Sequence, residues 1–119
     1  MQRSDRVGDE MRKIIADLIQ NEIKDPRMPA LASVTEVSVS RDLSHANVFV
    51  SVMGDEAAKA RCLEALTSAS GFIRRESGRR IRLRTMPELH FKIDDSIERG
   101  IRMTRLIDET LGEKKSHES

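Results

Sequence analysis

The sequence predicts an α+β domain in which helices cover one face of a small mixed sheet. Three observations support this fold class. Apolar residues at spacings of three and four mark two long helices, β-branched residues mark a hairpin between them, and a third alternating segment follows the second helix. The 119 residues suit one domain, which we place at residues 1–107, followed by a flexible C-terminal tail at 108–119.

The first helix is expected near the start of the chain, with Ser4 and Asp5 as candidate N-caps. Pro26 and Pro29 end it, because proline disfavours helical conformation in the residue before it and lacks a backbone donor. Its apolar stripe comprises Val7, Met11, Ile14, Ile15, Leu18, Ile19 and Ile23.

A β-hairpin is expected next, formed by "SVTEVSVS" (33–40) and "ANVFVSVM" (46–53) around a polar loop of about five residues. The second strand is apolar on one face and mixed on the other. We therefore expect a sheet that is covered on one side and partly open on the other.

The second helix is predicted to begin after Asp55, a plausible N-cap, and to be interrupted at "SASG" (68–71). Gly71 costs about 1 kcal/mol relative to alanine inside a helix, yet the residues after it again favour a helix. We predict two helical segments joined by a kink, the second ending at Gly78.

The segment "IRLRTMPELHFKID" (81–94) alternates apolar and polar residues and predicts a third strand, with Pro87 at its start, at an edge or at a bulge. Because helices separate it from the hairpin, it can pair in parallel through a right-handed crossover. Asp95 and Glu98 have the spacing of a capping box, which predicts a short C-terminal helix.

Charge is distributed unevenly along the chain. The formal net charge is +1, but residues 1–67 carry −2, residues 68–93 carry +5 and residues 94–119 carry −2. Such a basic block typically binds phosphate, although an anionic membrane surface, an acidic protein or simple solvation are alternatives. Six arginines cause the excess: Arg74, Arg75, Arg79, Arg80, Arg82 and Arg84.

RNA is the favoured partner over duplex DNA, because the sequence has no helix-turn-helix, zinc finger or basic zipper. The chain has no Trp or Tyr, and its three phenylalanines have spacings that fit the core, Phe49 being the one left open. Readout of the RNA backbone and shape is therefore expected, rather than base stacking on an aromatic platform.

Catalytic and metal sites are not indicated. His45, His90 and His117 lack metal-ligand spacing among themselves or to Cys62, which has the surroundings of a small buried hydrophobe. Asp94 and Asp95 are explained by capping the last helix. We predict no metal, no cofactor and no enzymatic activity. No apolar run could span a bilayer and no secretory signal is visible, so we expect a cytoplasmic protein without a membrane partner.

Three motifs resemble the ribosome-binding factor A family of bacterial small-subunit maturation factors: "VSRDLSHANVFVSV" (39–52), "ASGFIRRESGRRIRLRTMPELHF" (69–91) and "DDSIERGIRM" (94–103). The resemblance covers about residues 5–107. It implies a type II KH-like fold with a three-stranded mixed sheet, in which an Ala-x-Gly kink, here Ala69, Ser70 and Gly71, replaces the usual GxxG loop. One departure is Ser77, where the family usually has an apolar residue.

The resemblance implies a monomeric protein that binds free 30S subunits or precursors through 16S ribosomal RNA. It would assist 5′-end processing and late maturation, including growth in the cold, with the six arginines on its RNA-contacting surface. Alternatives are a KH-like protein-interaction module that uses the acidic C-terminal segment, or a general RNA-binding protein not tied to the ribosome. A small RNA-modifying enzyme would have His90 as its only candidate catalytic group.

Overall fold

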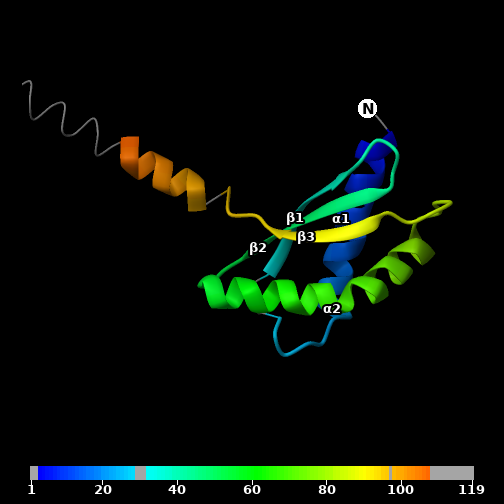
Figure 1. The fold of residues 1–119 in the computed structure, drawn as a ribbon, viewed down its shortest axis with the longest axis horizontal. Coiled ribbons are helices and arrows are strands. Elements are labelled where there is room, and N and C mark those ends of the chain that lie inside the picture. Colours follow the sequence, from blue (N-terminus) through cyan, green and yellow to red (C-terminus); the bar gives the residue numbers. More distant parts are fainter. Residues whose placement is uncertain (1–2, 29–31, 97, 108–119) are drawn as a thin grey trace, which may run out of the picture.

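The structure, a computed structural model, describes residues 3–28, 32–96 and 98–107. The predicted tail at 108–119 lies outside the described residues. The elements follow the order α1 (Arg3–Asn21), β1 (Ala32–Val39), β2 (His45–Val52), α2 (Glu56–Arg80) and β3 (Glu88–Ile93), and residues 98–107 are also helical (Figure 1). The predicted α+β class is confirmed.

The three strands form one mixed sheet in the order β1-β2-β3. β1 and β2 are antiparallel, as the predicted hairpin requires, and the loop between them covers the five residues 40–44. β3 is parallel to β2, so α2 makes the crossover connection. Both hairpin strands begin one residue earlier than the sequence pattern suggested.

β1 contains a bulge that its sequence pattern conceals. The pairing register with β2 shifts between Val34 and Glu36, which makes Thr35 the additional residue. The bulge turns Val34 and Val37 to the same side, and both are buried although they are three residues apart.

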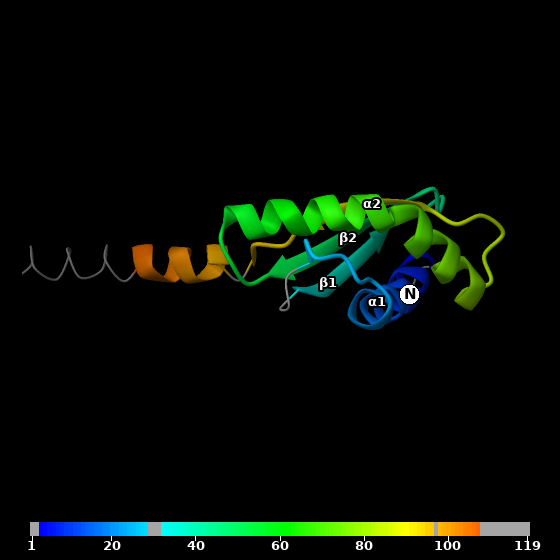
Figure 2. The ribbon, with the colours of Figure 1, turned by 90° about the horizontal axis from the view of Figure 1, so that it is seen from below.

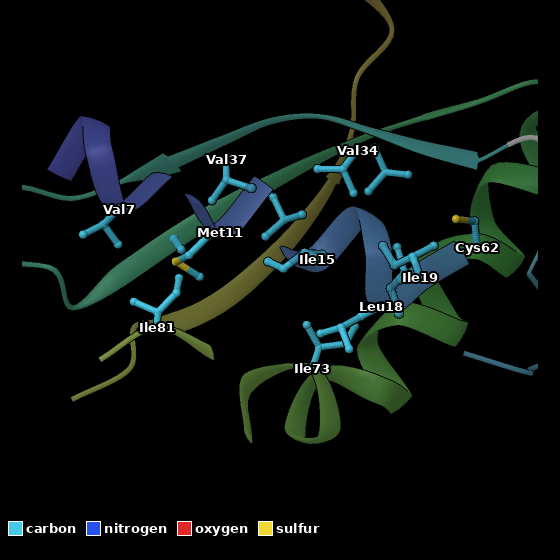
Figure 3. Close-up of a cluster of buried hydrophobic side chains, with 14 of the residues drawn as sticks. Val7, Met11, Ile15, Leu18, Ile19, Val34, Val37, Cys62, Ile73 and Ile81 are labelled. Carbon is cyan, nitrogen blue, oxygen red and sulfur yellow. The ribbon is translucent and has the colours of Figure 1, made fainter. Parts of the chain in front are cut away.

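α1 and α2 cover the same face of the sheet, as predicted. The β2 residues on that face are fully or almost fully buried, whereas the alternate residues are more exposed. Figure 3 shows the core, where residues of α1 such as Met11 and Ile15 face the valines of β1. The remaining face of the sheet is open. The buried β2 residues are Ala46, Val48, Val50 and Val52.

Gly8 brings α1 unusually close to β1. A Cβ atom at this position would lie 2.5 Å from the backbone oxygen of Val37, nearer than any side chain tolerates. The close approach therefore requires glycine here.

α2 begins as predicted but continues differently. Its N-cap is confirmed, because the Asp55 side chain accepts the N–H of Ala58 at 2.8 Å. However, α2 is one uninterrupted helix, and it passes through Gly78 to Arg80. It continues because the N–H of Ile81 still donates to the oxygen of Ser77 at 2.8 Å; the extended backbone of Ile81 then ends it.

Figures 1 and 2 nevertheless show that the C-terminal part of α2 runs in a different direction from its first part. The two predicted directions are therefore present within one continuous helix. The assignment of the kink to Ala69, Ser70 and Gly71 stays a prediction.

The third strand is shorter than predicted. β3 begins at Glu88, directly after Pro87, and residues 81–87 form an irregular connection. Alternation at Ile81 and Leu83 looks like a strand in the sequence. It arises because Ile81 is buried as the residue that ends α2, while Leu83 packs against the same core.

The helix at 98–107 extends away from the sheet (Figures 1 and 2). The capping box predicted for Asp95 and Glu98 is not formed, because both side chains make other contacts. Glu98 accepts from Lys59 of α2 at 2.9 Å, and Asp95 pairs with Arg99 at 2.9 Å. Asp94 contributes to capping instead, because its side chain accepts the N–H of Ser96 at 2.9 Å.

Candidate nucleic-acid interface

The six arginines lie on two adjoining segments, and all six are exposed. Four of them belong to α2, because the helix continues to Arg80 and does not end at Gly78 as predicted. Arg82 and Arg84 lie on the connection 81–87 and not on the face of a strand, because β3 begins only at Glu88. The basic surface is thus a helix end and the irregular segment that leaves it.

Arg74 and Arg80 are engaged within the protein. The guanidinium of Arg74 donates to the backbone oxygen of Met86 at 2.7 Å, which holds the connection 81–87 beside α2. Arg80 forms an ion pair with Asp17 of α1 at 2.8 Å. The hydrogen bond from Arg80 lowers the pKa of the Asp17 carboxyl and raises the pKa of the guanidinium. These two arginines join segments of the fold.

The other four arginines are more available to a ligand. Arg79 has a long ion pair with Glu76 at 3.4 Å, and its side chain is 75% exposed. Arg75, Arg82 and Arg84 make no hydrogen bond or ion pair with any described residue. Because such guanidinium groups need not break an internal contact before they bind phosphate, they are the strongest candidates for contacting RNA.

A depression of about 420 Å³ lies along the C-terminal part of α2, and it is lined by Gly71, Arg74, Arg75, Gly78 and Met86. Gly71 and Gly78 are seven residues apart, which is about two helical turns, so they share one face of α2. A Cβ atom at Gly71 would meet nothing within 4 Å, whereas one at Gly78 would meet the side chain of Met86 at 3.1 Å. A ligand backbone can therefore approach the helix closely at Gly71, beside Arg74 and Arg75. Sequence reasoning missed Gly78 and Met86 as lining residues, although the spacing of the two glycines was visible.

Local contacts favour bending of α2 just before this depression. The hydroxyl of Ser70 donates to the backbone oxygen of Thr67 at 2.8 Å. Side-chain donation to a preceding helical carbonyl often bends a helix. Gly71 follows immediately, and a Cβ atom placed on it would meet nothing within 4 Å.

The aromatic residues offer no broad stacking platform, in agreement with the sequence. Phe72 and Phe91 are partly buried and pack against the core. Phe49 is half-buried on β2, on the face that the helices leave open. It is therefore the only one of the three that faces away from the helices.

Groups that suit covalent or metal chemistry lie outside this depression. Cys62 is fully buried, and burial raises the pKa of its thiol, which makes it a poor nucleophile. Among the described residues, His45, Glu88 and His90 form the one group whose side chains could together hold a metal ion. His117 lies outside the described residues.

No described helix is both long and apolar enough to cross a membrane.

The element order and the mixed β1-β2-β3 sheet define a KH-like α+β domain, with a basic surface at the end of α2. Comparison with known proteins makes this specific, because the family model described as "Ribosome-binding factor A" matches residues 3–107. The chain belongs to the ribosome-binding factor A family.

Similar proteins share most of this chain. A ribosome-binding factor A of Acetivibrio thermocellus is 56% identical over 115 residues, covering 97% of this chain and 94% of the relative. One from Clostridium botulinum strain Hall is 49% identical over 117 residues, covering 98% and 94%.

Solved structures confirm the fold. The crystal structure of ribosome-binding factor A from Thermus thermophilus has a TM-score of 0.68 and 29% identity, covering 76% of this chain and 93% of that one. A homology model of the Thermus thermophilus factor, fitted into a cryo-EM map of a 30S–RbfA complex, has a TM-score of 0.60 and 30% identity, covering 74% and 91%.

Proposed function

We propose that this chain binds free 30S subunits or their precursors through 16S ribosomal RNA, using the arginines at the end of α2 and on the connection 81–87. The observation that carries the proposal is the set of exposed guanidinium groups of Arg75, Arg82 and Arg84, which pair with no described residue. Arg75 also lines a depression that is formed in part by glycines. Family membership and the 30S complex of the Thermus thermophilus factor support the ribosome as the source of that RNA.

The proposed mechanism is selective binding, with no covalent step. The arginines contact phosphates, while Arg74 and Arg80 hold the connection 81–87 and α1 in place around the surface. A bound protein favours whichever RNA arrangement it binds more tightly. If immature 16S RNA presents the matching arrangement, the protein stabilises it and leaves when the mature arrangement no longer fits.

The stage of ribosome assembly at which the protein acts is a further part of the proposal. We place the protein in late 30S maturation, including processing of the 5′ end of 16S RNA and growth in the cold. In this role it acts as a cytoplasmic monomer, and no ATP, metal or catalytic group takes part in the docking step.

Co-sedimentation with salt-washed 30S subunits and with 30S precursors, across a salt series, tests the proposal. The variant Arg82→Glu with Arg84→Glu removes two unpaired guanidinium groups. The matched control is Arg6→Glu with Lys13→Glu, which makes the same change in net charge on exposed positions of α1. Equal unfolding midpoints would show that both variants keep the fold.

We expect binding that weakens with salt, and its loss in the Arg82/Arg84 variant but not in the control. Two lost phosphate contacts should reduce the salt slope by about 1.4 to 1.8. Equal effects of the two variants would contradict the assigned surface. Equal binding to unrelated RNA would favour a general RNA-binding protein, and binding abolished only by truncation after Ile93 would favour a protein-interaction module.

A further inference from the structure

His45, Glu88 and His90 lie together on the open face of the sheet, although they are far apart in the sequence. β2 and β3 are parallel, and their register places His45 directly beside Glu88. His90 follows two residues after Glu88, so alternation places it on the same face. One potential ligand atom from each of the three side chains lies within 4.8 Å of the others.

The distances suit one shared cation. Nδ1 of His45 lies 3.1 Å from Nε2 of His90 and 3.7 Å from a carboxylate oxygen of Glu88. Zinc bonds of about 2.1 Å at tetrahedral angles would place ligand atoms about 3.4 Å apart, which lies between these two distances. The side chains of His45 and Glu88 are 56% and 66% exposed, so they can adjust by rotation.

The backbone that carries these residues is firmly held. The N–H of Glu88 donates to the backbone oxygen of Ser44 at 2.9 Å, and the N–H of His45 donates to the hydroxyl of Ser40 at 3.1 Å. The hydroxyls of Ser40 and Ser44 each donate to the carboxylate of Asp42 at 2.7 Å, which fixes the loop that leads into β2. A metal site of defined geometry needs ligands on a backbone supported in this way.

We propose that His45, Glu88 and His90 bind one divalent transition-metal ion of the zinc class. Two imidazole nitrogens and one carboxylate oxygen are typical ligands of zinc and also suit nickel and copper, whereas magnesium and calcium prefer oxygen alone. The three side chains leave a fourth coordination position for water or for an oxygen of a partner. This revises the sequence expectation of no metal site, and it is independent of the proposed ribosomal role.

The spacing of 43 residues between His45 and Glu88 concealed this group in the sequence. Metal motifs are recognised in sequences by ligands a few residues apart. Here parallel pairing of two strands supplies the proximity, and that pairing is known only from the fold. The same distances also fit a metal-free arrangement, in which the two imidazoles share a hydrogen bond and the Glu88 carboxylate contacts Nδ1 of His45.

Calorimetric titration of the metal-free full-length chain with ZnCl2 distinguishes the two arrangements. We expect one zinc ion per chain, at least tenfold weaker affinity in His45→Ala and in His90→Ala, and a weaker site in Glu88→Gln. His117→Ala and Glu36→Gln are the matched controls and should bind zinc as the wild type does. Absence of wild-type binding, or equal affinity in all variants, would overturn the proposal.

A second measurement needs no substitution. Imidazole nitrogen resonances of the wild-type chain, recorded by NMR with and without ZnCl2, should shift at Nδ1 of His45 and Nε2 of His90. Shifts at His117 alone would show that zinc binds elsewhere and would refute the site. Co-sedimentation with 30S subunits is read separately, so failure of zinc binding leaves the ribosomal proposal standing.

Discussion

Replacing Gly8 with alanine tests how closely α1 packs on the sheet, and with it the frame that holds Asp17 beside Arg80. The added Cβ would lie 2.5 Å from the backbone oxygen of Val37. That is about 1 Å inside an ordinary van der Waals contact. Val37 lies within β1, paired with β2, so its oxygen cannot rotate away as a side chain can, and α1 must shift.

The expected loss of stability follows from two opposing terms. Overpacking a tight contact costs roughly 1–3 kcal/mol, whereas alanine gains about 1 kcal/mol over glycine inside a helix. The net destabilisation should be about 1–2 kcal/mol, because a backbone oxygen yields less than a side chain and places the cost at the upper end of its range. For a domain of this size that corresponds to a fall in melting temperature of roughly 4–9 °C.

Gly71→Ala is the matched control, because the same substitution is made in a helix where the added Cβ meets nothing within 4 Å. It should raise the free energy of unfolding by about 0.5–1 kcal/mol. Urea denaturation followed by circular dichroism, with a common m-value, measures both variants. If Gly71→Ala gains stability and Gly8→Ala does so equally, the close approach of α1 to β1 is refuted.

Two further predictions concern single side chains. The buried hydroxyl of Ser77 has no hydrogen-bond partner among the described residues, so Ser77→Ala should raise the free energy of unfolding in urea by about 1 kcal/mol. A loss of stability would show that the hydroxyl is bonded. Hydrogen bonds from Ser96 and Thr35 lower the pKa of Asp94 from 3.8 to about 2, so its stabilisation is fully present well above pH 3.8 and is lost as the pH falls to about 2. Asp94→Asn should lower the melting temperature at pH 7, and it should make the melting temperature fall less steeply between about pH 4 and about pH 2. The control Asp9→Asn, at an exposed position, should change neither the melting temperature at pH 7 nor this fall. An unchanged fall in Asp94→Asn would contradict the lowered pKa of Asp94.

The main elements could be predicted because each has a local cause. Periodic apolar residues define α1, β-branched residues define the hairpin, and Asp55 caps α2 as its residue type suggests. The predictions fail where one sequence pattern fits two different structures. Alternation at Ile81 and Leu83 resembles a strand, but a strand also needs a neighbour to accept its backbone hydrogen bonds, and only the fold shows that no described strand pairs with these residues.

The sequence predicts which residues form the candidate site but not which contacts they make. Clustering of six arginines is visible in the sequence, but the pairing of Arg80 with Asp17 joins residues 63 positions apart. The donation from Arg74 to Met86 likewise depends on how the connection 81–87 returns along α2. The residues that bind a ligand and those that hold the site together look alike until the chain is folded.

This division of the arginines bears on how the surface can recognise RNA. A guanidinium that is already paired with Asp17 gains less from a phosphate, because binding must replace or share that contact. Arg75, Arg82 and Arg84 carry no such cost, and two of them lie on a segment that Arg74 holds against the helix. Contacts to phosphates position a protein without reading bases. Under the proposed function, selectivity for one RNA arrangement would then come from the shape of the depression that Gly71 and Gly78 line in part.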